Sequence, residues 1–300
     1  MPRKLIAIAN PISGKGKAAK LGPRLARLAR ESGVEIHLRL TTHAGHSQEL
    51  AHDARAEGYD AIVACGGDGT VNDIVNGMRD NPLPLMLVAM GTGNVLAKEI
   101  GATANPMRYA QALREWRLLS RDLGQLNGGR LFTCFVGAGF DGECTRQIKE
   151  ARRGGSMKMW QYVPAIWRAI ASANFTTISA TLDGSQRVEG ASFALAAITP
   201  AYGGPLALTP QAKANDGLLD VLTIHEPITF LSVMRLLALG FVRQIASHRR
   251  AKVTRATTVA LEAREPGGRE VPIQVDGDFA GYLPVDCRML PGALQMLDPR

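Results

Sequence analysis

A glycine-rich stretch between residues 63 and 77 carries the residue types best suited to binding a charged ligand. Gly66, Gly67 and Gly69 surround Asp68, between a short apolar run and a segment with helical spacing. This order predicts a strand, a glycine-rich turn and the start of a helix. Glycine lets a ligand approach the backbone without a Cβ in the way, and the amides at a helix N-terminus attract anions. Because a carboxylate here can meet the metal ion that accompanies a polyphosphate, the stretch predicts a nucleotide-phosphate loop.

Two acidic turns further along the chain could supply a base and a metal ligand. Asp276-Gly277-Asp278 follows the strand-like run 272–275. An aspartate near a nucleotide phosphate could take the proton from an attacking hydroxyl group. The segment 215–220, Asn-Asp-Gly-Leu-Leu-Asp, could hold a metal ion. Each segment could equally be an ordinary Asp-Gly turn, and the residues alone leave both interpretations open.

Two other motifs match known phosphate-binding patterns only in part. The run 10–17 lacks the glycine spacing of a P-loop, and Ala18 stands where Ser or Thr would bind a metal ion. As a polar turn after a strand it can still lend amides to phosphates. The run 137–142 matches G-x-G-x-x-G, but residues 151–182 contain no acid that could bind a ribose. We therefore interpret it as a tight turn that carries Asp141 toward a site.

Composition narrows the class of protein. A chain of 300 residues with 46% hydrophobic and 21% charged residues predicts a globular protein of two domains. Its net charge of +8 favours anionic partners, whereas 5% aromatic residues argue against a nucleic-acid surface. The four cysteines have no C-x-x-C spacing and are expected to be reduced thiols in the cytosol. We expect no signal peptide or membrane span, so any work at a membrane is done from its surface.

The first 125 residues alternate between strand-like and helix-like segments. The expected strands are 4–9, 34–40, 61–65 and 85–88, and the expected helices are 17–31, 47–57 and 71–78. Such alternation predicts βαβ units and a mainly parallel sheet, in which ligands bind beyond the carboxyl ends of the strands. The glycine-rich turns 13–16, 66–70 and 91–94 all follow expected strands. They can therefore share one edge of the sheet.

After Asp122 the pattern changes to short alternating segments, which predict an antiparallel β domain. The expected strands are 131–136, 177–182, 193–198, 219–224, 253–261 and 271–275, with helices near 158–173 and 228–247. We predict a nucleotide-binding domain over residues 1–125, completed by 285–300, and a β-rich acceptor domain over 126–284. Aromatic and basic residues in 157–173 fit either a membrane-surface segment or a helix packed on its own core.

Taken together, the motifs resemble the diacylglycerol kinase-type catalytic domain family of bacterial lipid kinases, which also contains sphingosine and ceramide kinases. The motifs occur in one order: Asn10-Pro11-x-Ser13-Gly14, Thr41 ahead of Gly45-His46, Gly66-Gly67-Asp68-Gly69-Thr70-x-Asn72, Gly91-Thr92-Gly93-Asn94, Gly139-Phe140-Asp141, Asn215-Asp216-Gly217-Leu218 and Asp276-Gly277-Asp278. The resemblance covers nearly the whole chain. NAD kinases and phosphofructokinases share the Gly-Asp-Gly core, and the C-terminal motifs favour lipid kinases.

The resemblance implies an ATP site in a cleft between an α/β domain, similar to those of NAD kinase and phosphofructokinase, and an antiparallel β-sandwich. The implied ATP contacts are Asn10, Pro11, Ile12, Ser13, Gly14, Thr41, Gly66, Gly67, Asp68, Gly69, Thr70, Val71, Asn72 and Thr92. Asp68 would engage the Mg²⁺-phosphate group, and Asp278 would be the general base. Many relatives carry Glu at this last position. Asp216 would bind a structural Mg²⁺ with the backbone carbonyls of Lys213 and Leu218.

The function that the resemblance implies is an ATP-dependent lipid kinase, which transfers the γ-phosphate to the hydroxyl group of a diacylglycerol-type membrane lipid. The alternatives are a sphingoid-base or ceramide kinase of the same family, a kinase of a soluble hydroxyl compound such as NAD, and a nucleotide-sensing module. We expect a cytoplasmic protein of phospholipid biosynthesis, associated peripherally with the inner leaflet, without a nucleic-acid partner. A homodimer through an exposed sheet edge stays open.

Overall fold

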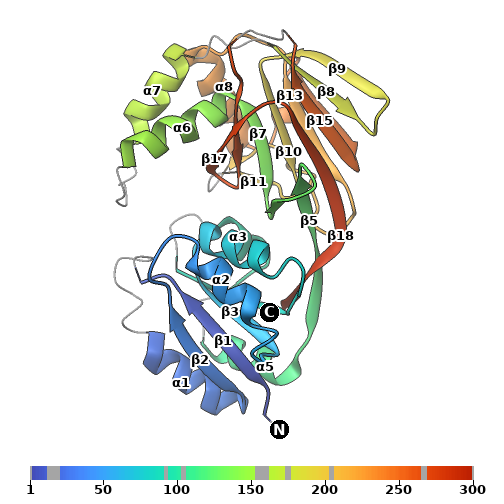
Figure 1. The fold of residues 1–300 in the computed structure, drawn as a ribbon. Helices are drawn as coiled ribbons and strands as arrows, with labels where there is room; N and C mark the ends of the chain where they lie inside the picture. Colours follow the sequence, from blue (N-terminus) through green and yellow to red (C-terminus); the bar gives the residue numbers. More distant parts are fainter. Residues whose placement is uncertain are drawn as a thin grey trace. The chain divides into compact units, whose positions relative to one another are not determined.

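A first unit, which comprises Met1–Leu123 and Pro291–Arg300, contains short parallel strands that are mainly apolar except for the edge strand Glu35–Leu40. The order across its sheet is β2 (Glu35–Leu40), β1 (Lys4–Ala9), β3 (Ala61–Gly66), β4 (Leu85–Ala89) and the end of β18 (Val285–Leu297). The computed structural model describes residues 2–11, 21–90, 94–102, 106–152, 162–172, 177–202, 206–264 and 269–298. Figure 1 shows the arrangement of the elements within each unit.

Helices cover both faces of the parallel sheet, which explains why β3, and β1 after Lys4, are continuous apolar runs. Side chains of α1 (Leu21–Ser32) and α5 (Pro106–Glu115) share one core with alternate residues of β1 and β3. The helices α2 (His46–Asp53) and α3 (Asp68–Gly77) pack against each other and on the same two strands from the other side. The short helix α4 (Val95–Glu99) follows β4.

The second unit, Gly124–Leu290, contains two sheets. One has the antiparallel order β14 (Ala251–Ala256), β13 (Leu219–Ile224), β10 (Phe193–Ala197), β7 (Phe135–Gly139), β16 (Pro272–Val275) and β17 (Asp278–Tyr282). The other contains the first part of β18, then β15 (Thr258–Ala263), β8 (Ile178–Leu182) and β9 (Gln186–Ala191). On the other side of β18 lies β5 (Leu118–Leu126), which in turn pairs with β6 (Leu131–Phe132). The chain enters this unit along β5 and leaves it along β18.

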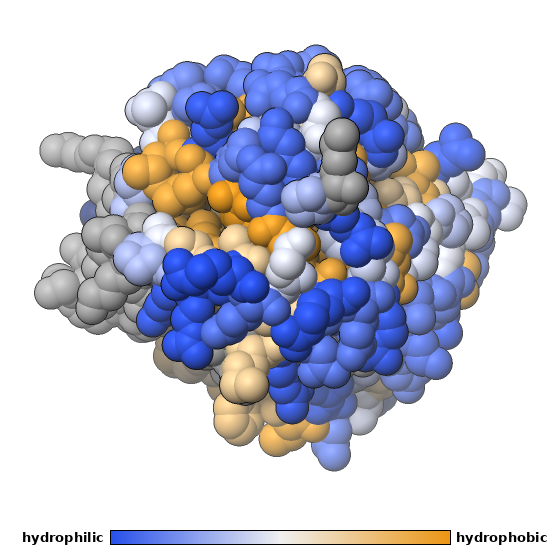
Figure 2. All heavy atoms as spheres, turned by 90° about the horizontal axis from the view of Figure 1, so that it is seen from below, coloured by the Kyte–Doolittle hydropathy of each residue, from blue (hydrophilic) through white to orange (hydrophobic). Residues whose placement is uncertain are grey.

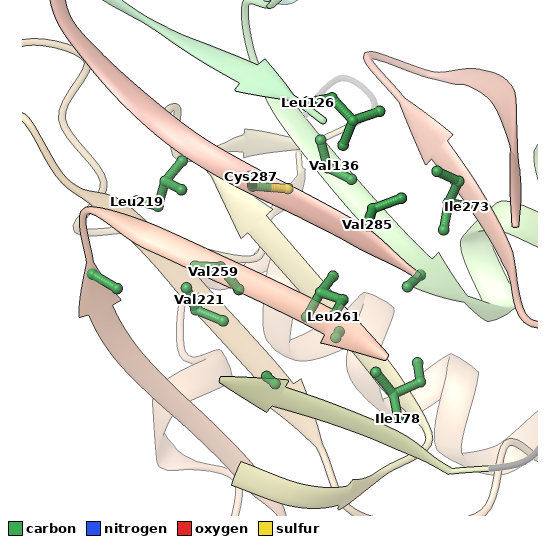
Figure 3. Packing of buried hydrophobic residues seen from close by; sticks show 14 of the residues in the cluster. Leu126, Val136, Ile178, Leu219, Val221, Val259, Leu261, Ile273, Val285 and Cys287 are labelled. Atoms are coloured by element: carbon green, nitrogen blue, oxygen red, sulfur yellow. The ribbon is translucent and has the colours of Figure 1, made fainter. Parts of the chain in front are cut away.

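Side chains from both sheets of the second unit form one core. Val136 and Val221 from the first sheet join Ile178, Val259 and Leu261 from the second, and Figure 3 shows these side chains between the strands. The packing is that of a β-sandwich. The predicted fold class is therefore confirmed, with a mainly parallel α/β unit and an antiparallel β unit.

The second unit also carries helices outside its sheets. These are α6 (Phe140–Arg152), α7 (Tyr162–Ser172), α8 (Phe230–Phe241) and the 3₁₀ turn η3 (Ile245–Ser247), beside the small pair β11 (Ala201–Tyr202) and β12 (Leu206–Ala207). Across the described residues, no helix is both long and apolar enough to cross a bilayer. Hydrophilic side chains cover most of the face seen in Figure 2, with a smaller hydrophobic area among them.

Several predicted elements were wrong in their bounds, and the predicted strand 131–136 is in fact β6 and the start of β7, which lie in different sheets. The segment 253–261 is two strands in different sheets, because Asp183 Oδ1 accepts hydrogen bonds from the amides of Thr257 and Thr258 and fixes the corner between them. Helix α3 begins at Asp68 and not at residue 71, so the expected turn is already helical. The run 137–142 is the end of β7 followed by the start of α6, and not a tight turn.

Candidate functional site

The glycine-rich stretch joins β3 to α3 in the first unit. Gly66 ends the strand, Gly67 has an extended backbone, and Asp68 is the first helical residue. Glycine at the N-cap position provides no side-chain acceptor for the first amides of the helix. These amides and the positive end of the helix dipole make the start of α3 suited to an anion.

Glycine is required at one position of this stretch and not at another. A Cβ added to Gly66 would lie 2.4 Å from Thr70 Oγ1 and 2.5 Å from Thr70 Cβ, so the first turn of α3 packs directly on the end of β3. A Cβ added to Gly69 would meet no atom within 4 Å. Gly66 therefore serves the packing of the fold, whereas Gly69 leaves an exposed backbone that a ligand can approach.

Asp68 connects the starts of two helices. Its Oδ1 accepts a hydrogen bond from the amide of Leu96, in α4, at 3.3 Å. The side chain is half-buried, and its position in the first turn of α3 is favourable to the helix dipole. Carboxylate oxygens at this place can also contact a hard cation carried by a polyphosphate.

Other residues expected at the nucleotide site follow neighbouring strands of the same sheet. Ala9 pairs with Leu40 and with Cys65, so the ends of β1, β2 and β3 lie side by side. Asn10, Pro11 and Thr41 come directly after these ends, next to the glycine-rich stretch. Thr70, Val71 and Asn72 are buried in α3. Ile12, Ser13, Gly14 and Thr92 lie outside the described residues.

In the second unit, the two aspartates of the turn 276–278 have opposite environments. Asp276 has a positive φ of 51°, and its carboxylate accepts the amides of Thr133, Cys134 and Phe135 at 2.7, 2.8 and 3.0 Å. Burial raises the pKa of Asp276, and these amides act in the opposite direction. Asp278 is exposed at the start of β17. Asp276 thus fixes the turn, and Asp278 is the carboxylate that a ligand can reach.

A second buried carboxylate, that of Asp141, is linked to the same turn through Gln274. Asp141 Oδ2 accepts from Gln274 Nε2 at 3.0 Å and from the Tyr202 hydroxyl at 3.3 Å. Gln274 Oε1 in turn accepts the amide of Gly277 at 2.8 Å. Burial outweighs these hydrogen bonds and raises the pKa of Asp141 to about 6. The sequence drew attention to Asp141, but Gln274 and Tyr202 carried no recognisable signal because only the fold brings them together.

An apolar cavity of about 70 Å³ lies beside Asp141, between α8 and the antiparallel sheet. Its walls include Leu222 and Ile224 of β13 and Leu236 and Leu237 of α8. Asp141 and Tyr202 are the polar residues of the lining. The sequence predicted a helix in this region but not a cavity beneath it.

The segment expected to bind a metal ion forms a turn rich in oxygen atoms. Asp216 Oδ1 accepts the amide of Leu218 at 3.1 Å, and Asp216 Oδ2 lies 4.0 Å from Arg255. Asp220 is buried, and its Oδ2 has no hydrogen-bond partner among the described residues. Burial raises the pKa of Asp220, and Asp216 adds to this effect.

This donor set fits a hard cation in its chemistry. Carboxylate and carbonyl oxygens are the ligands that Mg²⁺ takes, and an unpaired buried carboxylate oxygen is stabilised by a nearby cation. Arg255 supplies part of that positive charge, with its Nε 3.3 Å from Asp220 Oδ1. Lys213 and Leu218 could contribute only their backbone carbonyls. Within the described ranges, no group of three or more His, Cys, Asp and Glu residues could hold a metal ion.

Comparison with known proteins identifies the family. The family model "Diacylglycerol kinase catalytic domain" matches residues 4–126, and "YegS C-terminal NAD kinase beta sandwich-like domain" matches residues 134–298. A diacylglycerol kinase of Mycobacterium tuberculosis (strain ATCC 25618 / H37Rv) is 31% identical over 305 residues, which cover 99% of this chain and 96% of the relative. This chain belongs to the diacylglycerol kinase family. The resemblance derived from its motifs is thereby confirmed.

Other members of the diacylglycerol kinase family agree with this assignment. A diacylglycerol kinase of Bacillus subtilis (strain 168) is 25% identical over 280 residues, covering 92% of this chain and 90% of the relative. The crystal structure of a diacylglycerol kinase from Bacillus anthracis str. Sterne has the same fold, with a TM-score of 0.70 at 20% identity over 99% of this chain and 96% of that chain. The chain is therefore a kinase, an enzyme that phosphorylates a hydroxyl acceptor.

Proposed function

We propose that this protein transfers the γ-phosphate of ATP to the hydroxyl group of a diacylglycerol-type membrane lipid. Membership of the diacylglycerol kinase family supports the reaction class. The observation that supports a lipid as the acceptor is the cavity beside α8. Its lining is aliphatic and aromatic apart from Asp141 and Tyr202. An acyl chain gains free energy on entering such a lining, whereas a sugar phosphate or NAD would lose hydrogen bonds to water there.

The residue roles follow from the environments of the side chains. The amides at the start of α3, next to Gly69, bind phosphate oxygens, and Asp68 engages the Mg²⁺ that accompanies them. The cation would neutralise charge on the transferred phosphoryl group. Asp278 accepts the proton of the attacking hydroxyl group. Support for this assignment is the exposure of Asp278 on a turn that Asp276 holds rigidly.

A second cation, with a structural role, belongs to this proposal. Asp216, with the carbonyl oxygens of Lys213 and Leu218, would hold Mg²⁺ in the turn before β13. The buried Oδ2 of Asp220 supports a positive charge near this turn. We also propose that the enzyme acts from the cytoplasm at the inner leaflet, because its substrate is dissolved in the membrane. A sphingoid base or ceramide remains the alternative acceptor, since either also carries a long apolar chain.

The test is incubation of the purified protein with radiolabelled ATP, Mg²⁺ and mixed micelles of a single candidate lipid. Diacylglycerol, monoacylglycerol, phosphatidylglycerol, sphingosine and ceramide are compared, with NAD as a soluble acceptor. We expect label in diacylglycerol, and loss of that label in Asp68→Ala and Asp278→Ala proteins that unfold like the wild type. Label in NAD alone would contradict the lipid acceptor. Full activity of Asp278→Ala would remove the general base from Asp278.

A further inference from the structure

Helix α8 is apolar on the side that faces solvent as well as on the side that faces its sheet. Val233, Leu236 and Leu237 line the cavity from the inner side. On the outer side, Leu231 is 73% exposed and Phe241 is 65% exposed. A helix that is hydrophobic all round is normally buried on all sides. With 12 residues, α8 is too short to cross a bilayer, so its outer face requires another apolar environment.

The exposed hydrophobic side chains of the protein are concentrated at this place. Six of the ten exposed large hydrophobic residues in the described part of the chain lie on α7, on α8 or directly after α8. They are Trp167, Phe230, Leu231, Met234, Phe241 and Val242, and we call them the α8 patch. The rings of Trp167 and Phe230 stack with their centroids 4.9 Å apart, which joins the two helices. A contiguous apolar patch of this kind marks an interaction surface.

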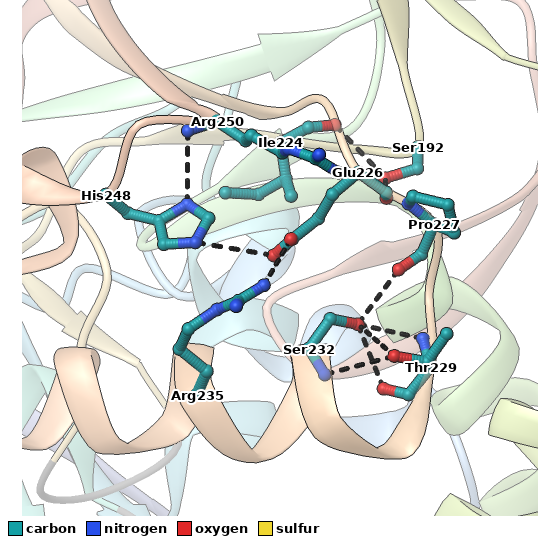
Figure 4. Close-up of polar contacts among 9 residues, drawn as sticks. All are labelled: Ser192, Ile224, Glu226, Pro227, Thr229, Ser232, Arg235, His248 and Arg250. Carbon is teal, nitrogen blue, oxygen red and sulfur yellow. Dashed lines mark hydrogen bonds and ion pairs between the residues drawn. The ribbon is translucent and has the colours of Figure 1, made fainter.

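The one charged residue of α8, Arg235, is held by a buried partner. Arg235 forms an ion pair with Glu226, which is buried beside His248, and Figure 4 shows these contacts. Its charge is therefore largely compensated on the protein side. The start of α8 is fixed by a capping box, in which Thr229 and Ser232 exchange hydrogen bonds. The ion pair and the capping box both hold α8, which carries most of the patch, in place on the second unit.

Positive charge follows the patch along the chain. Arg243, Arg249 and Arg250 are exposed, and Lys252 is exposed on β14. Between residues 225 and 250 the only acid is Glu226, which is buried. An apolar helix face bordered by arginines matches the surface of an anionic bilayer, with acyl chains beneath negatively charged head groups. In a symmetric dimer through this face the same arginines would meet each other, which is unfavourable.

We propose that the α8 patch, with the arginines beside it, docks this protein on membranes that contain anionic phospholipids. Docking places the outer face of α8 in the bilayer interface while its inner face lines the apolar cavity. A lipid chain then passes from the bilayer to the protein beside one helix. The proposal rests on the proposed function only for the identity of that lipid. Membrane binding itself requires neither ATP nor phosphoryl transfer and is measured without them.

The experiment is flotation of the purified full-length protein with vesicles of phosphatidylcholine alone or of phosphatidylcholine mixed with phosphatidylglycerol. We expect the wild type to float with the mixed vesicles and much less with the neutral ones. Leu231→Glu should lower the partition coefficient about tenfold or more, since a buried leucine side chain is lost from the interface. Arg249→Gln and Arg250→Gln should each lower it about fivefold on mixed vesicles only, because each removes one positive charge. Met107→Glu, on α5 with an exposure of 67%, is the matched control and should float like the wild type.

Each result decides between docking and its alternatives. Equal flotation of Leu231→Glu and wild type would overturn the proposal, as would a wild type that binds neither kind of vesicle. A wild-type dimer that Leu231→Glu converts to a monomer in size-exclusion chromatography would assign the patch to a second copy. With a lipid dispersed in detergent micelles, Leu231→Glu should keep wild-type phosphorylation and lose it only on vesicles. An inactive protein that still floats would contradict the proposed function and leave docking supported.

Discussion

At the residue scale, the environment of each carboxylate separates structural from chemical roles. Asp276 and Asp278 are two positions apart, yet one accepts three backbone amides and the other faces solvent. Asp141 is buried in the first turn of α6 and is connected to the same turn through Gln274. A general base must be accessible to its substrate. A structural carboxylate is instead occupied by hydrogen-bond donors of the protein. The two kinds of residue should therefore respond differently to substitution.

We expect Asp276→Ala to destabilise the protein by about 3 kcal/mol, because three amides and the Thr133 hydroxyl would lose a charged acceptor. Asp278→Ala should change the free energy of unfolding by less than about 0.5 kcal/mol, as is usual for exposed positions. Urea unfolding followed by circular dichroism measures both values. Equal stability of the two variants would show that Asp276 does not fix the turn.

The buried Asp141 predicts a pH dependence of stability. Its pKa is about 6 in the folded protein, above the ordinary value of 3.8, because burial disfavours the charged form. The folded state then holds the proton more tightly than the unfolded state. The stability that protonated Asp141 contributes to the folded state is therefore fully present below about pH 4, and it is lost as the pH rises through 6. The free energy of unfolding of the wild type, minus that of Asp141→Asn, should fall by about 2 kcal/mol from pH 4 to pH 7. A difference that is flat across this range would contradict the raised pKa.

At the scale of elements, the junction of β3 and α3 combines packing with ligand approach. Gly66 has no room for a side chain because Thr70 lies against it, whereas Gly69 faces open space. Substitution of Gly66 should therefore affect the stability of the fold, whereas substitution of Gly69 should affect ligand binding.

We expect Gly66→Ala to cost about 1–3 kcal/mol of stability, because the first turn of α3 must move away from the strand. Gly69→Ala is its matched control and should stabilise the protein by up to about 1 kcal/mol, since alanine favours the helix. If ATP phosphates approach at this turn, Gly69→Ala should nevertheless weaken ATP binding, which isothermal titration calorimetry measures. Unchanged ATP affinity in the stable Gly69→Ala protein would place the phosphates elsewhere.

The sequence predicted the strands of the first unit closely, because a strand covered on both faces is a continuous apolar run. The strand 4–9 has the predicted bounds, and so has 219–224 in the second unit. Local composition could not show that Asp68 already belongs to a helix, since glycine and aspartate are typical of turns. Local composition also could not show that the segment 253–261 is two strands. The corner between them at Thr257 is fixed by Asp183, more than seventy positions away in the chain.

The candidate site shows the same division between local and distant information. The aspartates 68, 141, 216, 276 and 278 were all found in short motifs with glycine. The burial and hydrogen bonds of these aspartates could not be predicted from the sequence, because they depend on partners such as Thr133 and Tyr202 from other strands. Helix α6, which contains Asp141 in its first turn, was also missed, since its many charged residues gave no apolar periodicity.

At the scale of the whole molecule, the first unit is assembled from both ends of the chain. Residues Pro291–Arg300 belong to it, and Met296 pairs with Leu85 on β4. Leu297 is buried in the core that α1 and α5 form with the sheet. The first unit therefore cannot be complete until the second has been synthesised, and its stability should depend on the last strand.

Truncation after Leu290 tests this dependence. The deletion removes Leu294, Met296 and Leu297, which are each about 1% exposed, and opens the edge of β4. Burying such side chains contributes about 1.5–3 kcal/mol each, so the loss is comparable to the 5–15 kcal/mol that stabilises a typical domain. Hydrogen exchange with mass spectrometry should show lost protection in β1 and β3, while β10 and β13 stay protected. Deletion of residues 299–300 alone is the control and should leave all four strands protected. Protected β1 amides in the truncated protein would mean that the first unit folds without the last strand.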